Sequence, residues 1–188
     1  MARVQDVANF FINLAQEQAQ CDLGDLMTNL RLQKLLYFAQ GSYLARYGKS
    51  LFDEELRKWD HGPVVESICR KYKVNGREGF MLDESFDENA YTSEEMELLL
   101  DVAREYDKYS TGQLVGMTHE RGTPWCYAEQ NGVISKESIQ SYFVKNASLK
   151  TFRDLMKKVD ILIPKRDENG QAVIDRSAAE GWEAVHEG

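Results

Sequence analysis

Cysteine and histidine are scarce in this chain of 188 residues, which contains three of each. The cysteines are far apart and form no paired spacing, so we expect reduced thiols at Cys21, Cys69 and Cys126. The histidines lack metal-ligand spacing, which argues against a metal site at His61, His119 and His186. The Gly-x-Ser-x-Gly, Walker and dinucleotide-binding motifs are also absent. The sequence therefore predicts neither a cofactor nor a metal, and it favours a protein that is not an enzyme.

Long hydrophobic runs are missing as well. No apolar run approaches the roughly 18 residues that are needed to span a bilayer. Polar residues interrupt the apolar ones near the start of the chain, which is not typical of a signal peptide. We therefore expect a cytoplasmic protein. With 43% hydrophobic residues, the chain is most simply one domain with a substantial core.

Charge is unevenly distributed along the sequence. The net charge of −8 argues against nucleic acid as the main partner, because phosphate binding needs clustered lysine and arginine. Residues 83–107 contain ten acidic residues and one arginine, whereas residues 145–166 contain seven basic and two acidic residues. Opposed charge sectors of this kind can steer a protein partner.

Apolar residues at helical spacing predict a mainly α fold. They indicate one helix over residues 3–19 and a central core helix that ends at Gly48, where a left-handed residue is needed. Helix starts are expected from their N-cap signatures, two of which are capping boxes, at Thr28, Thr92, Ser110 and Ser135. The helices together predict a single compact helical domain.

The segment around Gly62-Pro63 is harder to interpret. The Gly-Pro step forces a turn, and proline suits the first position of a helix. We therefore expect a helix from Pro63 to Lys73, carrying apolar residues on one face.

The C-terminal part of the chain has a different character. Asn169-Gly170 lies between two short apolar runs, which is the strongest short-range signal for a β-hairpin. A helix is expected before it at 149–158, and Ser177 could begin a last short helix. The expected fold class is thus mainly α with a short C-terminal β-hairpin.

Three short motifs occur in order along the chain, namely Leu32-Gln33-Lys34-Leu35-Leu36-Tyr37, Trp59-x-x-Gly62-Pro63-Val64 and the loop from His119 to Pro124-Trp125. Over residues 4–145 the chain resembles the Panacea domain, which is also called the SocA-like antitoxin domain. The resemblance marks ten motif residues: Gln33, Lys34, Tyr37, Trp59, Gly62, Pro63, Val64, His119, Pro124 and Trp125. It predicts a helical domain over 1–145 and a variable extension over 146–188 that contains a helix, the β-hairpin and a short helix.

Most motif residues are expected to build the scaffold. Tyr37 falls on the apolar stripe of the central helix, and Trp59 is expected to bury its ring and to find a partner for its N–H. Gly62-Pro63 supplies a turn and a helix start. The polar members could either form a core hydrogen-bond network or face a partner: Gln33, Lys34 and His119.

The resemblance implies a small bacterial or phage-associated protein, often encoded on a prophage. Its relatives are antitoxins that bind and neutralise a toxin encoded beside them. One relative instead acts as an adaptor that delivers its toxin to a ClpX-type protease. An adaptor would need a second surface here, for which residues 83–107 or the C-terminal tail are candidates. A separate DNA-binding module, which many antitoxins carry, is not recognisable.

Basic and aromatic residues near the second and third motifs give a candidate toxin-binding surface. Its members are Arg70, Lys71, Tyr72 and Arg121. A third hypothesis, from another class, is a cryptic cysteine or metal-dependent hydrolase. Its catalytic pair would be Cys69 or Cys126 as nucleophile and His61 or His119 as base.

Overall fold

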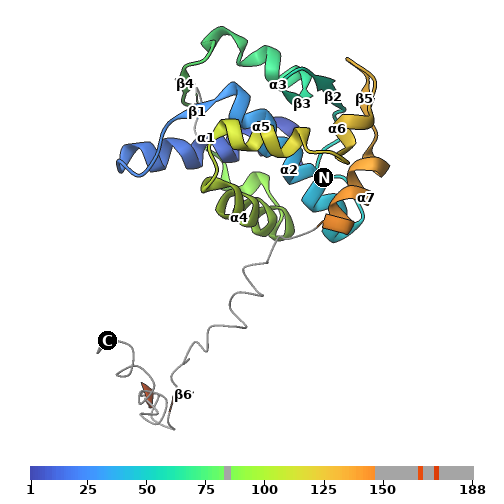
Figure 1. The fold of residues 1–188 in the computed structure, drawn as a ribbon. Coiled ribbons are helices and arrows are strands. Elements are labelled where there is room, and N and C mark those ends of the chain that lie inside the picture. The colour runs from blue at the N-terminus through green and yellow to red at the C-terminus, as the bar shows by residue number, and fades with distance from the viewer. Residues whose placement is uncertain (83–85, 147–164, 167–171, 174–188) are drawn as a thin grey trace, which may run out of the picture. The chain divides into compact units, whose positions relative to one another are not determined.

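The structure is a computed structural model in which residues 1–82, 86–146, 165–166 and 172–173 are described. The chain divides into two compact units, Met1–Thr151 and Phe152–Gly188. The first unit is mainly helical and contains two small sheets (Figure 1). Among the described residues, none of the helices is both long and apolar enough to span a membrane.

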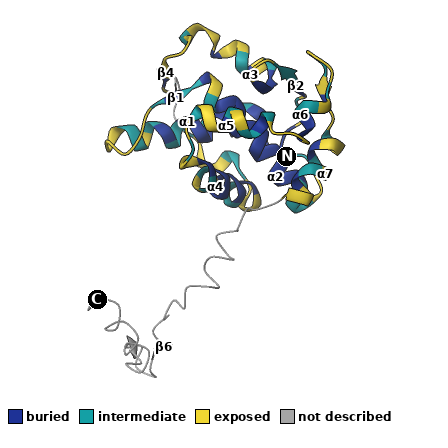
Figure 2. Ribbon diagram, viewed as in Figure 1, coloured by how far each residue is buried: buried dark blue, intermediate teal, exposed yellow. Residues whose placement is uncertain are grey.

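The helix α2, Asn29–Tyr47, is the centre of the first unit. It begins where Thr28 Oγ1 accepts a hydrogen bond from Arg31 N at 3.3 Å, and it ends at Gly48, which has a φ of +67°. Both predicted ends are confirmed. Most of its residues are buried on every side, because α1 (Val4–Gln20) and the other helices pack around it (Figure 2). A helix that is buried all round forms the core rather than one wall of it.

Three further helices begin at the predicted caps. Thr92 and Glu95 form the capping box of α4, Ser93–Asp107. Ser110 and Gln113 form the capping box of α5, Thr111–His119. Ser135 Oγ accepts a hydrogen bond from Ser138 N at 3.2 Å and so starts α7, Lys136–Asn146. The capping signatures therefore located these helices correctly.

The prediction of a helix that begins at Pro63 is wrong. Pro63 lies in the strand β3, Gly62–Val65, which pairs antiparallel with β2, Leu56–Trp59. The helix α3 begins only afterwards and covers Glu66–Lys71. Gly62 has a φ of +100°, so the chain can reverse over two residues, and Trp59 pairs with Gly62. A proline is tolerated in β3 because this is an edge strand, where a missing N–H breaks no ladder.

The remaining elements of the first unit are short. The strand β5, Val133–Ile134, adds to the other side of β2, which gives the strand order β3-β2-β5. A second sheet pairs β1, Met27–Thr28, with β4, Gly79–Phe80. Short helical turns complete the unit, and they are η1 at Lys73–Asn75, η2 at Glu88–Ala90 and α6 at Pro124–Tyr127.

In the second unit, β6, Lys165–Arg166, pairs antiparallel with β7, Ala172–Val173. The predicted Asn169-Gly170 turn, the helix at 149–158 and the helix from Ser177 lie outside the described residues.

An aromatic cluster fixes α2 against α4 and α7. The rings of Phe38 and Tyr106 stack with centroids 4.1 Å apart, and the Tyr37 ring meets the Phe143 ring edge-on at 5.4 Å. Gly41 lies directly beneath Phe143, and a Cβ at this position would overlap the ring. The close approach of α7 to α2 therefore depends on the missing side chain at Gly41.

Gly41→Ala tests this packing. We expect the variant to lose about 1–3 kcal/mol of unfolding free energy, because a buried methyl group must displace a packed ring. The matched control is Gly116→Ala in α5, where a Cβ would meet nothing within 4 Å. That change should instead stabilise the protein by about 0.5–1 kcal/mol, since alanine is the better helix former. Chemical denaturation measures both, and equal effects would contradict the proposed contact.

Candidate functional site

The three sequence motifs meet at the β2–β3 hairpin. Lys34 Nζ in α2 donates a hydrogen bond to Pro63 O at 2.8 Å. His119 Nε2, at the end of α5, lies 3.0 Å from Asp60 O, and Trp125 Nε1 in α6 donates to Trp59 O at 2.9 Å. Side chains from three helices thus bind main-chain oxygens on both strands and the turn of one hairpin.

Gln33 extends this network toward α3. Its Oε1 accepts a hydrogen bond from Val65 N at 2.9 Å, and its Nε2 donates to Asn29 Oδ1 at 3.1 Å. Asn29 Nδ2 in turn donates to Cys69 O at 2.9 Å. Gln33 is buried, so these bonds replace the water that its amide has lost. The geometry of the polar motif residues favours a core hydrogen-bond network over contact with a partner.

Lys34 is fully buried, with 0% of its surface exposed. Burial lowers the pKa of its amine from 10.5 to about 7, and the neighbouring Cys69 opposes this shift only in part. A lysine can occupy such a site because it loses charge easily and still donates a hydrogen bond. Lys34 is therefore a structural amine whose protonation changes near neutral pH.

Gly62 allows the amine to reach the hairpin. A Cβ at Gly62 would lie 2.5 Å from Lys34 Nζ and 2.6 Å from Thr118 Oγ1. The φ of +100° also places this residue where other amino acids are strained. Both space and conformation thus require glycine here.

His119 and Trp125 pack against each other beneath the turn. Their ring centroids are 3.8 Å apart, and Lys58 Nζ lies 4.5 Å from the centre of the Trp125 ring. His119 Nδ1 is 2.7 Å from Val115 O, so both ring nitrogens face main-chain oxygens. These contacts lock the two rings and the hairpin into one arrangement.

The other motif residues have mixed exposure. Tyr37, Val64 and Pro124 are buried, and the Tyr37 hydroxyl has no hydrogen-bond partner in the described part of the chain. Trp59, however, is only half-buried, which corrects the expectation of a buried ring. Its side chain lines an open cavity of about 430 Å³ together with His61 and Cys69.

This cavity does not assemble the catalytic pair of the hydrolase hypothesis. Cys69 and His61 both line it, but no hydrogen bond joins their side chains within the described ranges. Burial raises the pKa of the Cys69 thiol, which disfavours the nucleophilic thiolate. The Cys126 thiol donates to Glu120 O at 3.2 Å, while His119 faces main-chain oxygens. Residues 1–82 and 86–146 also contain no group of three or more side chains suited to hold a metal ion.

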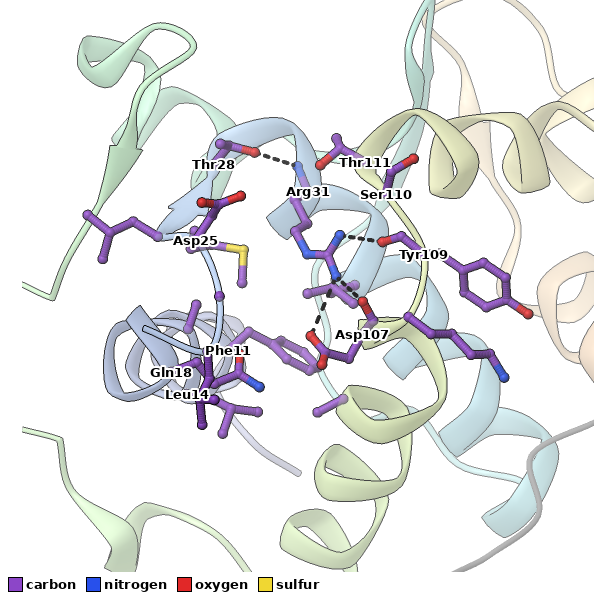
Figure 3. A pocket seen from close by; sticks show the side chains of 18 residues that line it. Phe11, Leu14, Gln18, Asp25, Thr28, Arg31, Asp107, Tyr109, Ser110 and Thr111 are labelled. Atoms are coloured by element: carbon purple, nitrogen blue, oxygen red, sulfur yellow. Dashed lines mark hydrogen bonds and ion pairs between the residues drawn. The ribbon is translucent and has the colours of Figure 1, made fainter. Parts of the chain in front are cut away.

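A second cavity, of about 490 Å³, lies between α1, the start of α2 and the junction of α4 with α5 (Figure 3). Arg31 crosses its wall and donates hydrogen bonds to Tyr109 O at 2.7 Å and to Asp107 O at 3.3 Å. It also pairs with the Asp107 carboxylate at 3.9 Å. Arg31 therefore caps the carboxyl end of α4, and its guanidinium is largely used within the fold. No local sequence pattern predicts this role for Arg31.

The residues of the predicted partner surface are not all accessible. Arg70 and Lys71 are exposed on α3, where Arg70 pairs with Glu66. Tyr72 is 5% exposed, stacks on Phe80 with centroids 4.4 Å apart and accepts a hydrogen bond from Gln5 Nε2. It belongs to the core, which corrects its assignment to a surface. Arg121 is exposed and lies beside a groove on another part of the unit.

Gly62→Ala tests the close approach of the amine to the hairpin. Gly122→Ala is the matched control, because Gly122 has a φ of +95° but a Cβ there would meet nothing within 4 Å. The control should lose about 1–2 kcal/mol of unfolding free energy from its backbone conformation. Gly62→Ala should lose about 1–3 kcal/mol more because of the added overlap. Denaturant unfolding measures both, and equal losses would show that the space around Lys34 is not tight.

Stability should also depend on the protonation of Lys34. Between pH 7 and 10 the unfolded chain keeps the proton that the folded protein has lost, since the two pKa values are 10.5 and about 7. The unfolding free energy should therefore rise with pH in this range, by at most about 1.4 kcal/mol per pH unit. Burial also raises the pKa of the Cys69 thiol from its ordinary 9.0, so this group opposes the rise above about pH 9. Burial raises the pKa of Tyr37, Tyr91 and Tyr106 as well, and their opposite effect begins only near pH 10.

Lys34→Met should flatten this rise, whereas Lys73→Met, at an exposed lysine, should keep it. The measurement is denaturant unfolding at several pH values between 7 and 10. Parallel curves for wild type and Lys34→Met would rule out Lys34 as the source of the dependence.

A family of known proteins matches the segment that contains the three motifs. Residues 32–126, which contain all three motifs, match the family model of the antitoxin SocA-like Panacea domain. The chain is similar to antitoxin SocA of Caulobacter vibrioides, with 28% identity over 112 residues. That alignment covers 53% of this chain and 58% of the relative, and no solved structure matches. With half of its length matched and the motif side chains gathered at one hairpin, the chain belongs to the SocA-like antitoxin family, which carries the Panacea domain.

Proposed function

We propose that this protein is an antitoxin that neutralises a cognate toxin by direct protein–protein binding, without a catalytic step. The observation that supports this most strongly is the match of residues 32–126 to the SocA-like antitoxin family. The similar protein of Caulobacter vibrioides is itself named an antitoxin. Because that alignment covers only part of each chain, the mode of action belongs to the proposal.

The geometry of the motif residues is consistent with a binding scaffold. The side chains of Lys34, His119 and Trp125 form hydrogen bonds with main-chain oxygens of the hairpin. An enzyme of this size would instead aim such groups into a cavity, where they could reach a substrate. The motif residues thus serve to hold a shape, and contacts with a toxin are left to exposed residues around them.

We assign toxin binding to residues 1–145 and treat residues 146–188 as a variable extension. The family match lies wholly within the first of these segments. Delivery of the toxin to a ClpX-type protease is an alternative mode of action, and host genetics can separate it from direct neutralisation.

Co-expression tests the proposed function. The product of the adjacent gene should arrest growth when expressed alone, and this protein should relieve the arrest and co-purify with that product. Relief should persist in a host that lacks ClpX, because direct binding needs no protease. An empty vector is the control.

Two outcomes would contradict direct neutralisation. If the adjacent product is harmless, or is toxic but neither bound nor relieved, the protein is not its antitoxin. If relief requires ClpX, the adaptor mode replaces direct neutralisation.

A further inference from the structure

A groove of about 670 Å³ runs between α6, β5 and the outer face of α7. Its apolar lining includes Tyr127 and Val133, which are 78% and 43% exposed. The strand β5 is the edge of its sheet, so its outer side pairs with no strand among the described residues. Apolar side chains beside an unpaired sheet edge are typical of a surface that another chain covers.

The charge of the groove is opposite to that of the protein. Arg121 and Lys145 line it, and none of its lining residues is acidic, although the net charge of the chain is −8. Within the described residues neither cation forms an ion pair. Glu120 precedes Arg121 but lines a different cavity, beside Phe38. The groove therefore combines two positive charges, which are unpaired among the described residues, with an apolar lining.

The inner side of the groove is firmly supported. The opposite face of α7 carries Ile139 and Phe143, which are buried against α2. Pro124 at the base of the groove is buried as well, and the neighbouring Trp125 is bonded to the hairpin. A preformed surface of this kind loses little conformational freedom when a partner binds.

We propose that this groove is the toxin-docking site, and that it takes a segment of the toxin in which a large apolar side chain is flanked by aspartate or glutamate. The inference rests on the proposed function and adds the site and the chemistry of the partner segment. The apolar side chain would cover Tyr127 and Val133, while the acidic groups would pair with Arg121 and Lys145. The exposed basic residues of α3 fit this role less well, because Arg70 is already paired with Glu66.

Charge reversal in the full chain tests the groove. The variant carries Arg121→Glu and Lys145→Glu, and the control carries Arg70→Glu and Lys71→Glu on α3, so both change the net charge equally. All four residues are exposed, and both variants should melt like wild type. The probe is the purified product of the adjacent gene, and calorimetry measures its dissociation constant.

The groove variant should bind the probe about 100-fold more weakly, or about tenfold for each reversed charge, while the control stays within about threefold of wild type. A photo-crosslinking residue at Tyr127 should capture the probe, and one at Val74, which is 89% exposed, should not.

The outcomes separate this inference from the proposed function. If wild type neutralises the toxin and the groove variant binds it equally well, the groove is wrong and the antitoxin function stands. If wild type itself does not bind the probe, the proposed function fails and the inference fails with it. If the groove variant changes the protein alone from dimer to monomer and leaves toxin binding intact, a second copy occupies the groove and the inference is overturned.

Discussion

The hydrogen bond from the buried Lys34 amine to Pro63 O joins the central helix to the β2–β3 hairpin, and the motif cluster is built around it. An amine in this position needs a neighbour without a side chain, which Gly62 supplies. The acceptor is the carbonyl oxygen of Pro63, and proline is tolerated at this position because β3 is an edge strand. The preceding residue on α2, Gln33, accepts a hydrogen bond from Val65 N and so attaches the helix to the strand two residues beyond Pro63. Residues from three separate parts of the sequence therefore form one hydrogen-bonded cluster around the hairpin.

Buried and exposed residues have different roles in this domain. The polar motif side chains point inward and form hydrogen bonds with main-chain groups. Few of them are therefore accessible to a partner protein. The exposed residues beside them, such as Arg121 and Tyr127, are positioned by that interior but are not used by it. The proposed antitoxin role fits such a division, because the buried motif residues hold the fold while the exposed surface can be specific for a partner.

Much of the helical part could be predicted from the sequence, because its signals are local. The cap at Thr28 and the capping boxes at Thr92 and Ser110 depend on residues within one helical turn. The β2–β3 hairpin was missed because its strands are four residues long and their pairing energy comes partly from distant side chains. Pro63 carried a signal that fits either a helix start or an edge strand, and its pairing with Lys58 across the β2–β3 hairpin places it in the strand.

The same limit applies to the candidate site, where local features could be predicted and long-range contacts could not. The motif residues could be found in the sequence by resemblance, but their contacts could not. Burial of a lysine is rare, so nothing local predicts it at Lys34. Arg31 binds main-chain oxygens that lie 76 and 78 residues away along the chain, and local patterns contain no information about such contacts. The groove beside Arg121 is lined by residues 121–146 alone, but its wall α7 is placed by packing against the distant helix α2.

The long sequence separation between the β2–β3 hairpin and Trp125, which binds it, has a consequence during protein synthesis. Trp59 and Trp125 are 66 residues apart, so the hairpin leaves the ribosome before the side chain that holds it exists. At about 5–20 residues per second, the interval is roughly 3–13 s. During that time the first two motifs are present without α5 and α7, which pack against the central helix. A nascent chain of this protein thus passes through a stage open to proteolysis, and a truncated product that ends before Trp125 would never leave it.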